Sequence, residues 1–197
     1  MATLEFFFDY SSPFAYLGST QVRGLAERTG ATLVYKPFFL GGLFRAIGTP
    51  DVPLAAMPDA KRDHARLDLR RYAALYGVEL NWPRGFPIMT VDALRLTLLA
   101  PEAKRPDLVD RIFRLCWVED TLPKAEALAT CCSDVGVDPE LVARVKEPAI
   151  KKAVIDGTEE AKERGVFGAP TYFVGDEMFW GQDRAVLVEH HVKALGA

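Results

Sequence analysis

The sequence predicts an α/β fold in which strands at the two ends of the chain flank a long run of helices. Three observations predict it. Residues 4–35 change from strand to helix to strand, residues 59–164 show almost entirely helical periodicity, and strand character returns at residues 171–180 before a last helix. The layout is therefore βαβ, a helical insertion, and ββα.

The first unit opens with alternating apolar residues over positions 4–8, which is the pattern of a half-buried strand. A helix is expected over residues 13–29, with Pro13 at its first position and Gly30 just beyond its end. Residues 32–35 then have the composition of a second strand. A strand, a helix and a strand in this order form a βαβ unit, whose strands run parallel with a right-handed crossover.

The last unit follows the helical stretch. Residues 171–174 and 178–180 are apolar and aromatic, and Gly175-Asp176 between them is a turn sequence, so a β-hairpin is expected. Residues 181–195 are expected to form the final helix. Together the two terminal units are the two halves of a thioredoxin-like fold.

The domain organisation follows from this layout. We expect residues 1–45 and 165–197 to form one thioredoxin-like domain, with residues 46–164 as a helical insertion domain set into its middle. The chain has 197 residues, of which 49% are hydrophobic and 11% aromatic. That length and composition suffice for an ordinary globular core.

Composition limits the possible partners and the compartment. There are 24 basic and 27 acidic residues, so a net charge of −3 gives no global attraction to nucleic acid or anionic membranes. No apolar run approaches the ~20 residues of a membrane span, and no signal peptide is expected. Cys116, Cys131 and Cys132 form no C-x-x-C motif and no metal-binding spacing. The sequence therefore predicts a cytoplasmic protein with reduced thiols, and neither a metal, nucleic acid nor membrane as partner.

The turn before the first helix is the first candidate site. In redox proteins of this fold the helix start carries a reactive cysteine, whereas this chain has Ser11 and Ser12 before Pro13. Unpaired N–H groups and the helix dipole stabilise an anion at that place. Ser12 lacks a neighbouring base that would make it a nucleophile, but its hydroxyl can donate to a thiolate supplied from outside. The alternative interpretation is that Ser12 only caps the helix.

The loop that enters the last unit is the second candidate. Ala169-Pro170 stands between Gly168 and Thr171, and an X-Pro bond between small residues at a strand entry is a candidate for the cis form. In thioredoxin-like folds this loop faces the start of the first helix. An extended peptide can pair there with the backbone of Ala169, unless the proline serves only as a structural turn.

The start of the final helix is the third candidate. Trp180, Gly181 and Gln182 offer free N–H groups that suit a small carboxylate, and Asp183 can hold an ammonium group. A carboxylate and an ammonium group close together describe the γ-glutamyl end of glutathione. The alternative is that Asp183 only caps the helix.

Three segments together resemble the 2-hydroxychromene-2-carboxylate isomerases and the related kappa-class glutathione transferases. They are residues 8–17, residues 39–45 and residues 168–184. The resemblance spans the whole chain and implies a glutathione-dependent enzyme, typically a homodimer. It implies that Ser12 hydrogen-bonds the glutathione sulfur and that Ala169-Pro170 pairs with the cysteinyl backbone. The segment from Trp180 to Asp183 would then hold the glutamyl end.

The resemblance also implies a substrate. The expected reaction interconverts 2-hydroxychromene-2-carboxylate-type compounds and trans-o-hydroxybenzylidenepyruvate-type compounds in aromatic hydrocarbon catabolism. Arg45 and Lys61 are the candidate cations for the substrate carboxylate, while Trp82 and Phe86 are candidate walls for its ring. Family members commonly carry Gly-Asn where this chain has Thr49 after a glycine, which bears on the substrate side of the site.

Two other functions stay open at this point. One is a kappa-type glutathione transferase that conjugates glutathione to electrophiles, and the other is a non-catalytic, peptide-binding thioredoxin-fold module. A disulfide oxidoreductase is excluded because the serines at positions 11 and 12 cannot exchange disulfides. The basic run over residues 61–71 is interpreted as a solvated helix face with ion pairs four residues apart.

Overall fold

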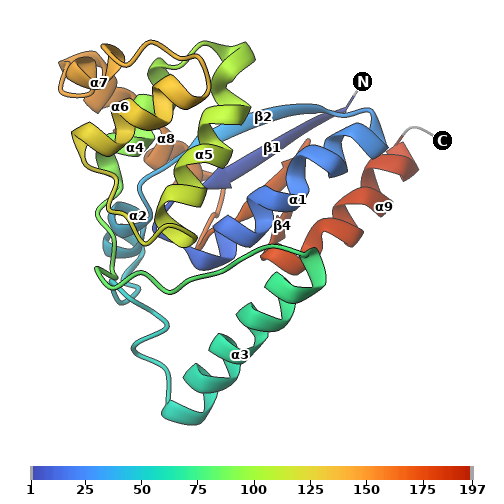
Figure 1. Ribbon diagram of the computed structural model, residues 1–197. Coiled ribbons are helices and arrows are strands. Elements are labelled where there is room, and N and C mark those ends of the chain that lie inside the picture. The colour runs from blue at the N-terminus through green and yellow to red at the C-terminus, as the bar shows by residue number, and fades with distance from the viewer. Residues whose placement is uncertain (1, 196–197) are drawn as a thin grey trace.

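A computed structural model describes residues 2–195 and contains a four-stranded sheet with the strand order β2-β1-β3-β4 (Figure 1). The strands are β1 (Thr3–Phe8), β2 (Thr32–Pro37), β3 (Thr171–Val174) and β4 (Glu177–Trp180). β1 runs parallel to β2 and antiparallel to β3, and β3 and β4 form a hairpin. The first and last units of the chain therefore share one sheet, which confirms the predicted thioredoxin-like fold.

Helices surround this sheet. They are α1 (Pro13–Thr29), α2 (Leu40–Ile47), α3 (Asp59–Tyr76), α4 (Val91–Leu99), α5 (Arg105–Trp117), α6 (Ala125–Asp134), α7 (Leu141–Arg144), α8 (Pro148–Glu163) and α9 (Ala185–Leu195). Short 3-10 turns precede α5 at Glu102–Lys104 and α9 at Gln182–Arg184. In Figure 1, α1 and α9 lie side by side, and α4 to α8 gather in the upper left of the view, where α5 packs against α1.

Local sequence explains the boundaries of α1. Pro13 occupies its first turn, and the preceding Ser12 is extended, with φ −95° and ψ 119°, as an N-cap residue requires. Gly30 ends the helix in the left-handed conformation, φ 66°, and its N–H donates to the carbonyls of Ala26 and Glu27. The helix predicted for residues 13–29 is confirmed at both ends.

Strict alternation along β1 separates the two faces of the sheet. Phe6 and Phe8 stack with centroids 5.3 Å apart, and Phe6 also packs on Tyr172 of β3. Phe7 points to the opposite face, where the guanidinium of Arg164 lies 5.4 Å from its ring centroid. Because all three phenylalanines are fully buried, both faces of β1 belong to the core.

The helix α3 differs from the others in its exposure. Its buried residues are Leu69 and Ala73, both in its C-terminal half. Figure 1 shows that this half lies near α1, whereas the N-terminal end of α3 stands out from the rest of the molecule. Within residues 2–195, no helix combines the length and apolar character that crossing a bilayer demands.

Candidate active site

The Ser12 hydroxyl connects the start of α1 to the loop before β3. Its oxygen accepts a 3.1 Å hydrogen bond from the Ala15 N–H, which makes it a genuine helix cap. The same hydroxyl donates a 2.9 Å hydrogen bond to the carbonyl oxygen of Ala169. Only 5% of Ser12 is exposed, so these contacts lie in a largely water-excluded place. The cap role is therefore observed, and it coexists with a contact to the second candidate segment.

The proline loop is built as its sequence indicates. The Ala169–Pro170 peptide is cis. Pro170 is fixed from the other side by the N–H of Gly181, which donates a 3.0 Å hydrogen bond to the Pro170 carbonyl. The side chain of Pro170 also lies against α1, since a Cβ at Gly18 would come within 2.9 Å of its Cγ. The glycine at position 18 thus permits the close approach of α1 to this loop.

The segment that begins the last helix lies next to the proline loop. Trp180 is 48% exposed and stacks on Phe167 with a centroid distance of 4.8 Å. Gln182 is buried, and its carbonyl accepts a 3.1 Å hydrogen bond from the hydroxyl of Tyr76 in α3. The carboxylate of Asp183 is already paired with the guanidinium of its neighbour Arg184. The structure therefore brings Ser12, the proline loop and the Trp180–Asp183 segment together, as the three sequence motifs predict.

A buried carboxylate, which the sequence analysis missed, supports this site. Asp9 follows β1 and is fully buried. One of its oxygens accepts from the Ser11 N–H at 3.0 Å and the Thr90 hydroxyl at 2.5 Å, and the other accepts from the Leu40 N–H at 2.8 Å. Burial raises the pKa of Asp9 above its usual range, and these hydrogen bonds partly oppose that rise. Asp9 thereby ties the turn before α1 to the starts of α2 and α4.

The predicted ring-binding residues do meet, around an aromatic side chain that the sequence analysis did not single out. The rings of Trp82 and Phe86 lie 4.8 Å apart, and both contact the buried Trp117, at 5.8 Å and 6.2 Å. Trp117 Nε1 donates a 2.7 Å hydrogen bond to the carbonyl of Tyr10. This aromatic group therefore borders the turn that carries Ser12. The one signal in the sequence for this contact was general: a buried tryptophan N–H needs a hydrogen-bond acceptor.

The predicted cations do not join this group. Arg45 and Lys61 are exposed, on α2 and near the outer end of α3, and neither forms an ion pair within residues 2–195. Nothing in the sequence near Arg45 or Lys61 connected these residues with the aromatic side chains. Their role toward a substrate stays a prediction.

The three cysteines of the chain are not suited to supply the nucleophile of this site. Cys116, Cys131 and Cys132 are free and buried. Burial raises the pKa of Cys131 and Cys132 to about 11, and raises that of Cys116 further. Among the described residues, no group of three or more histidines, cysteines and acidic residues is arranged to hold a metal ion. A thiolate at the start of α1 would have to come from another molecule.

Comparison with known proteins agrees with this architecture. Residues 3–193 match the family model of the DSBA-like thioredoxin domain. A 2-hydroxychromene-2-carboxylate isomerase of Pseudomonas putida is 32% identical over 188 residues, which cover 94% of this chain and 92% of that protein. A solved structure of 2-hydroxychromene-2-carboxylate isomerase covers 98% of this chain and 95% of its own, with a TM-score of 0.88 and 31% identity. Glutathione S-transferase kappa 1 of Caenorhabditis elegans is 27% identical over 94% of this chain and 88% of its own length.

The sheet, the cis-proline loop and a serine at the helix start define a thioredoxin-fold protein that lacks the redox cysteine of that position. The chain belongs to the DSBA-like thioredoxin domain family and, within it, to the 2-hydroxychromene-2-carboxylate isomerase family. The family predicted from the three motifs is confirmed.

Proposed function

We propose that the protein is a glutathione-dependent isomerase that interconverts 2-hydroxychromene-2-carboxylate-type and trans-o-hydroxybenzylidenepyruvate-type compounds. The observation that carries the proposal is the place of Ser12. Its hydroxyl stands at the N-terminus of α1 and contacts the cis-proline loop, where a redox protein of this fold would hold its own thiol. The full-length likeness to proteins named 2-hydroxychromene-2-carboxylate isomerase supports the reaction.

The residues around Ser12 fit glutathione. Within residues 2–195, the N–H groups of Phe14 and Ala169 donate to no other residue, so both are available to a ligand. Gly181 adopts φ 115°, and a Cβ there would meet the Asp183 carboxylate at 2.7 Å, so only glycine lets that acid approach the backbone so closely. We propose that Ala169 and Pro170 hold the cysteinyl part of glutathione and that Trp180, Gly181, Gln182 and Asp183 hold its glutamyl part. The kappa relatives, which are named glutathione S-transferases, support this cofactor.

The proposed chemistry depends on a negatively charged sulfur held at the start of α1. When bound, glutathione supplies a thiolate that adds reversibly to a conjugated double bond, which makes that bond single and free to rotate. The start of α1 stabilises negative charge through its dipole and the unpaired Phe14 N–H, and the Ser12 hydroxyl adds a donor. Trp82 and Phe86, whose rings pack 4.8 Å apart, offer an apolar wall for an aromatic ring.

The test measures two reactions on the same preparation. The isomerase hypothesis expects isomerisation of the chromene carboxylate to require glutathione and to leave its concentration unchanged. A kappa-type transferase would instead consume glutathione with a chlorinated dinitrobenzene and would not isomerise the chromene. Stoichiometric loss of glutathione without isomerisation would therefore replace our proposal by the transferase.

Glutathione binding itself is tested by stability. A ligand at ~100 times its dissociation constant adds ~2.7 kcal/mol to the free energy of unfolding, which a thermal shift detects. We expect Asp183→Asn to weaken that shift and Asp176→Asn, in the exposed turn of the β3–β4 hairpin, to leave it unchanged. No shift with millimolar glutathione in the wild-type protein would favour the non-catalytic, peptide-binding module.

We further propose that the protein works in the cytoplasm as a homodimer. The odd number of buried, free cysteines supports a reducing compartment. The exposed N-terminal half of α3 supports a contact with a second copy. Light scattering of the purified protein and fractionation of its host cells test the two statements separately.

A further inference from the structure

A cavity of about 300 Å³ lies between α3 and the chain segment that follows it. Its walls are a mixture of apolar surface and nitrogen donors, formed by Arg66, Leu69, Arg70, Leu80, Asn81 and Trp82. No acidic side chain contributes to this lining. Small-ligand sites commonly combine an apolar wall with a few converging polar groups in a cavity of this size.

The two arginines of the cavity are not ion-paired. Arg62 and Arg71 of the same helix pair with Asp59 and Asp68, which lie three residues away. Within residues 2–195, Arg66 and Arg70 form neither an ion pair nor a hydrogen bond. The basic run therefore divides into a solvated face, as the sequence predicted, and two free guanidinium groups that border the cavity. Their combined positive charge favours an anion there.

Trp82 gives the cavity a flat aromatic wall. The guanidinium of Arg66 lies 5.4 Å from the centre of the Trp82 ring, and 37% of this tryptophan is exposed. The Trp82 ring also packs against Phe86 and Trp117, with centroid distances of 4.8 Å and 5.8 Å, so it is held in place. An aromatic wall beside two forked cations suits a planar ring that carries a carboxylate.

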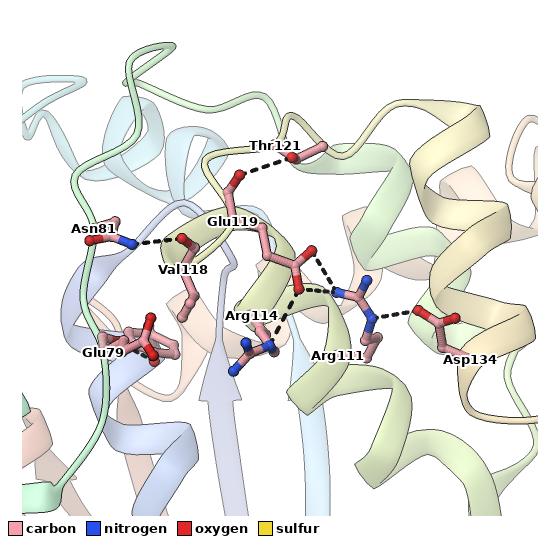
Figure 2. A network of polar contacts seen from close by, with 9 residues as sticks. Glu79, Asn81, Arg111, Arg114, Val118, Glu119, Thr121 and Asp134 are labelled. Carbon is pink, nitrogen blue, oxygen red and sulfur yellow. Dashed lines mark hydrogen bonds and ion pairs between the residues drawn. The ribbon is translucent and has the colours of Figure 1, made fainter.

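The cavity wall is fixed to the candidate active site. Asn81 donates from its N–H to the Trp117 carbonyl and from Nδ2 to the Val118 carbonyl, both at 2.7 Å. Figure 2 shows the second of these bonds, at the end of α5. The hydroxyl of Tyr16, one turn after Ser12 in α1, donates to the Glu79 carbonyl at 2.6 Å. The segment that lines the cavity is therefore anchored to the first turns of α1.

We propose that this cavity binds the carboxylate end of a small aromatic acid, with Arg66 and Arg70 on the carboxylate and Trp82 against the ring. The inference rests on the proposed isomerase function, whose substrates are aromatic carboxylates. It assigns the positive charge that binds the substrate carboxylate to Arg66 and Arg70, whereas the sequence had suggested Arg45 and Lys61.

The test uses chromone-2-carboxylate, a planar acid that cannot isomerise, and its uncharged carboxamide. We expect Arg66→Met and Arg70→Met each to weaken binding of the acid at least about tenfold, as loss of a charge-assisted hydrogen bond does. Binding of the carboxamide should be weak in wild type and unaffected by Arg70→Met. Arg71→Met, on the same helix but paired with Asp68, is the matched control and should bind the acid like wild type. Calorimetry measures the affinities, and circular dichroism checks that each variant is folded.

The outcomes separate this inference from the proposed function. If both arginine variants bind the acid as tightly as wild type, the cavity is not its site, even where isomerisation and the glutathione shift persist. If the variants lose the acid while wild type shows no isomerisation, the aromatic-acid site stands and the isomerase proposal falls. A change of oligomeric mass in both variants with unchanged affinity for the acid would assign the arginines to a subunit contact and overturn the inference.

Discussion

The hydroxyl of Ser12 donates its single hydrogen to the carbonyl of Ala169, which lies 157 residues later in the chain. The oxygen of that hydroxyl also accepts the Ala15 N–H, so one atom caps α1 and joins it to the proline loop. A bound thiolate must compete with the Ala169 carbonyl for the Ser12 hydrogen. The distance between α1 and this loop therefore controls how well the Ser12 hydroxyl can donate a hydrogen bond to a bound thiolate.

Replacing Ser12 by alanine should lower both stability and turnover. The variant loses a helix cap and leaves the Ala169 carbonyl without its donor, which together cost about 1–3 kcal/mol of the free energy of unfolding. Glutathione should still produce a thermal shift, because backbone groups make most of its proposed contacts. Urea unfolding and the isomerisation rate are the measurements.

Ser19→Ala is the matched control for that variant. Ser19 is also a buried serine of α1, but its hydroxyl donates to Tyr16 within the same helix. Its loss should leave turnover near the wild-type value. Wild-type turnover in Ser12→Ala would reduce Ser12 to a helix cap.

Gly18→Ala should be destabilising, because α1 approaches the proline loop closely at this point. A Cβ at position 18 would lie 2.6 Å from the Tyr172 hydroxyl oxygen and 2.9 Å from Cγ of Pro170. We expect a loss of about 1–3 kcal/mol and reduced turnover, since Tyr172 and the proline loop must shift to make room. Thermal unfolding and the isomerisation assay measure the two effects.

Gly24→Ala in the same helix should instead raise the free energy of unfolding. There the nearest atom to an added Cβ is the end of the flexible Arg28 side chain, at 3.1 Å. Alanine should stabilise this helical position by up to about 1 kcal/mol. If Gly24→Ala lost as much stability as Gly18→Ala, the loss at position 18 could not be assigned to its close contact with the proline loop.

The sequence predicted those features that short stretches determine. Pro13 and Gly30 mark the ends of α1 because their backbone preferences act locally. The meeting of Ser12 with Ala169 was expected only from the order of the strands, which the thioredoxin-like layout implied. The division of the chain at residues 46 and 165 stays a prediction.

Contacts that depend on packing of distant segments could not be predicted. Asp9 binds Leu40 and Thr90, and no spacing in the sequence indicates that their helices begin beside it. Arg66 of α3 has Asp63 three residues before it, yet both Arg66 and Arg70 stay unpaired and line the cavity. Which face of a helix meets a neighbour is decided by the assembled core.

The cysteine thiols should be inert in the folded protein. Burial raises the pKa of Cys131 and Cys132 to about 11, so at pH 8 roughly one thiol in a thousand is ionised. We expect Ellman's reagent to react at least ~100-fold faster after unfolding in urea than before. Isomerase activity should survive treatment with iodoacetamide. A rapidly reacting thiol in the native protein, with loss of activity, would mean that the chain supplies its own nucleophile.

The buried carboxyl of Asp9 should give the protein a distinctive pH dependence. Burial raises the pKa of Asp9 above its ordinary value of 3.8, so the folded protein binds this proton more tightly than the unfolded chain. Its contribution to stability is therefore complete below the ordinary pKa and is lost as the pH rises through the raised pKa. The amide side chain of the Asp9→Asn variant does not titrate, so this variant should lack that pH-dependent contribution to stability.

Asp9→Asn should also be destabilised throughout, by about 1–3 kcal/mol, because one donor of its amide must face a backbone N–H of Ser11 or Leu40. Urea unfolding from pH 4 to pH 8 should show the stability advantage of wild type over Asp9→Asn shrinking as the pH rises. Asp176→Asn, at an exposed turn, controls for removing one surface carboxylate. An advantage of wild type that stays constant, or grows, across this range would mean that Asp9 is ionised throughout, held as an anion by its three donors and the starts of α2 and α4.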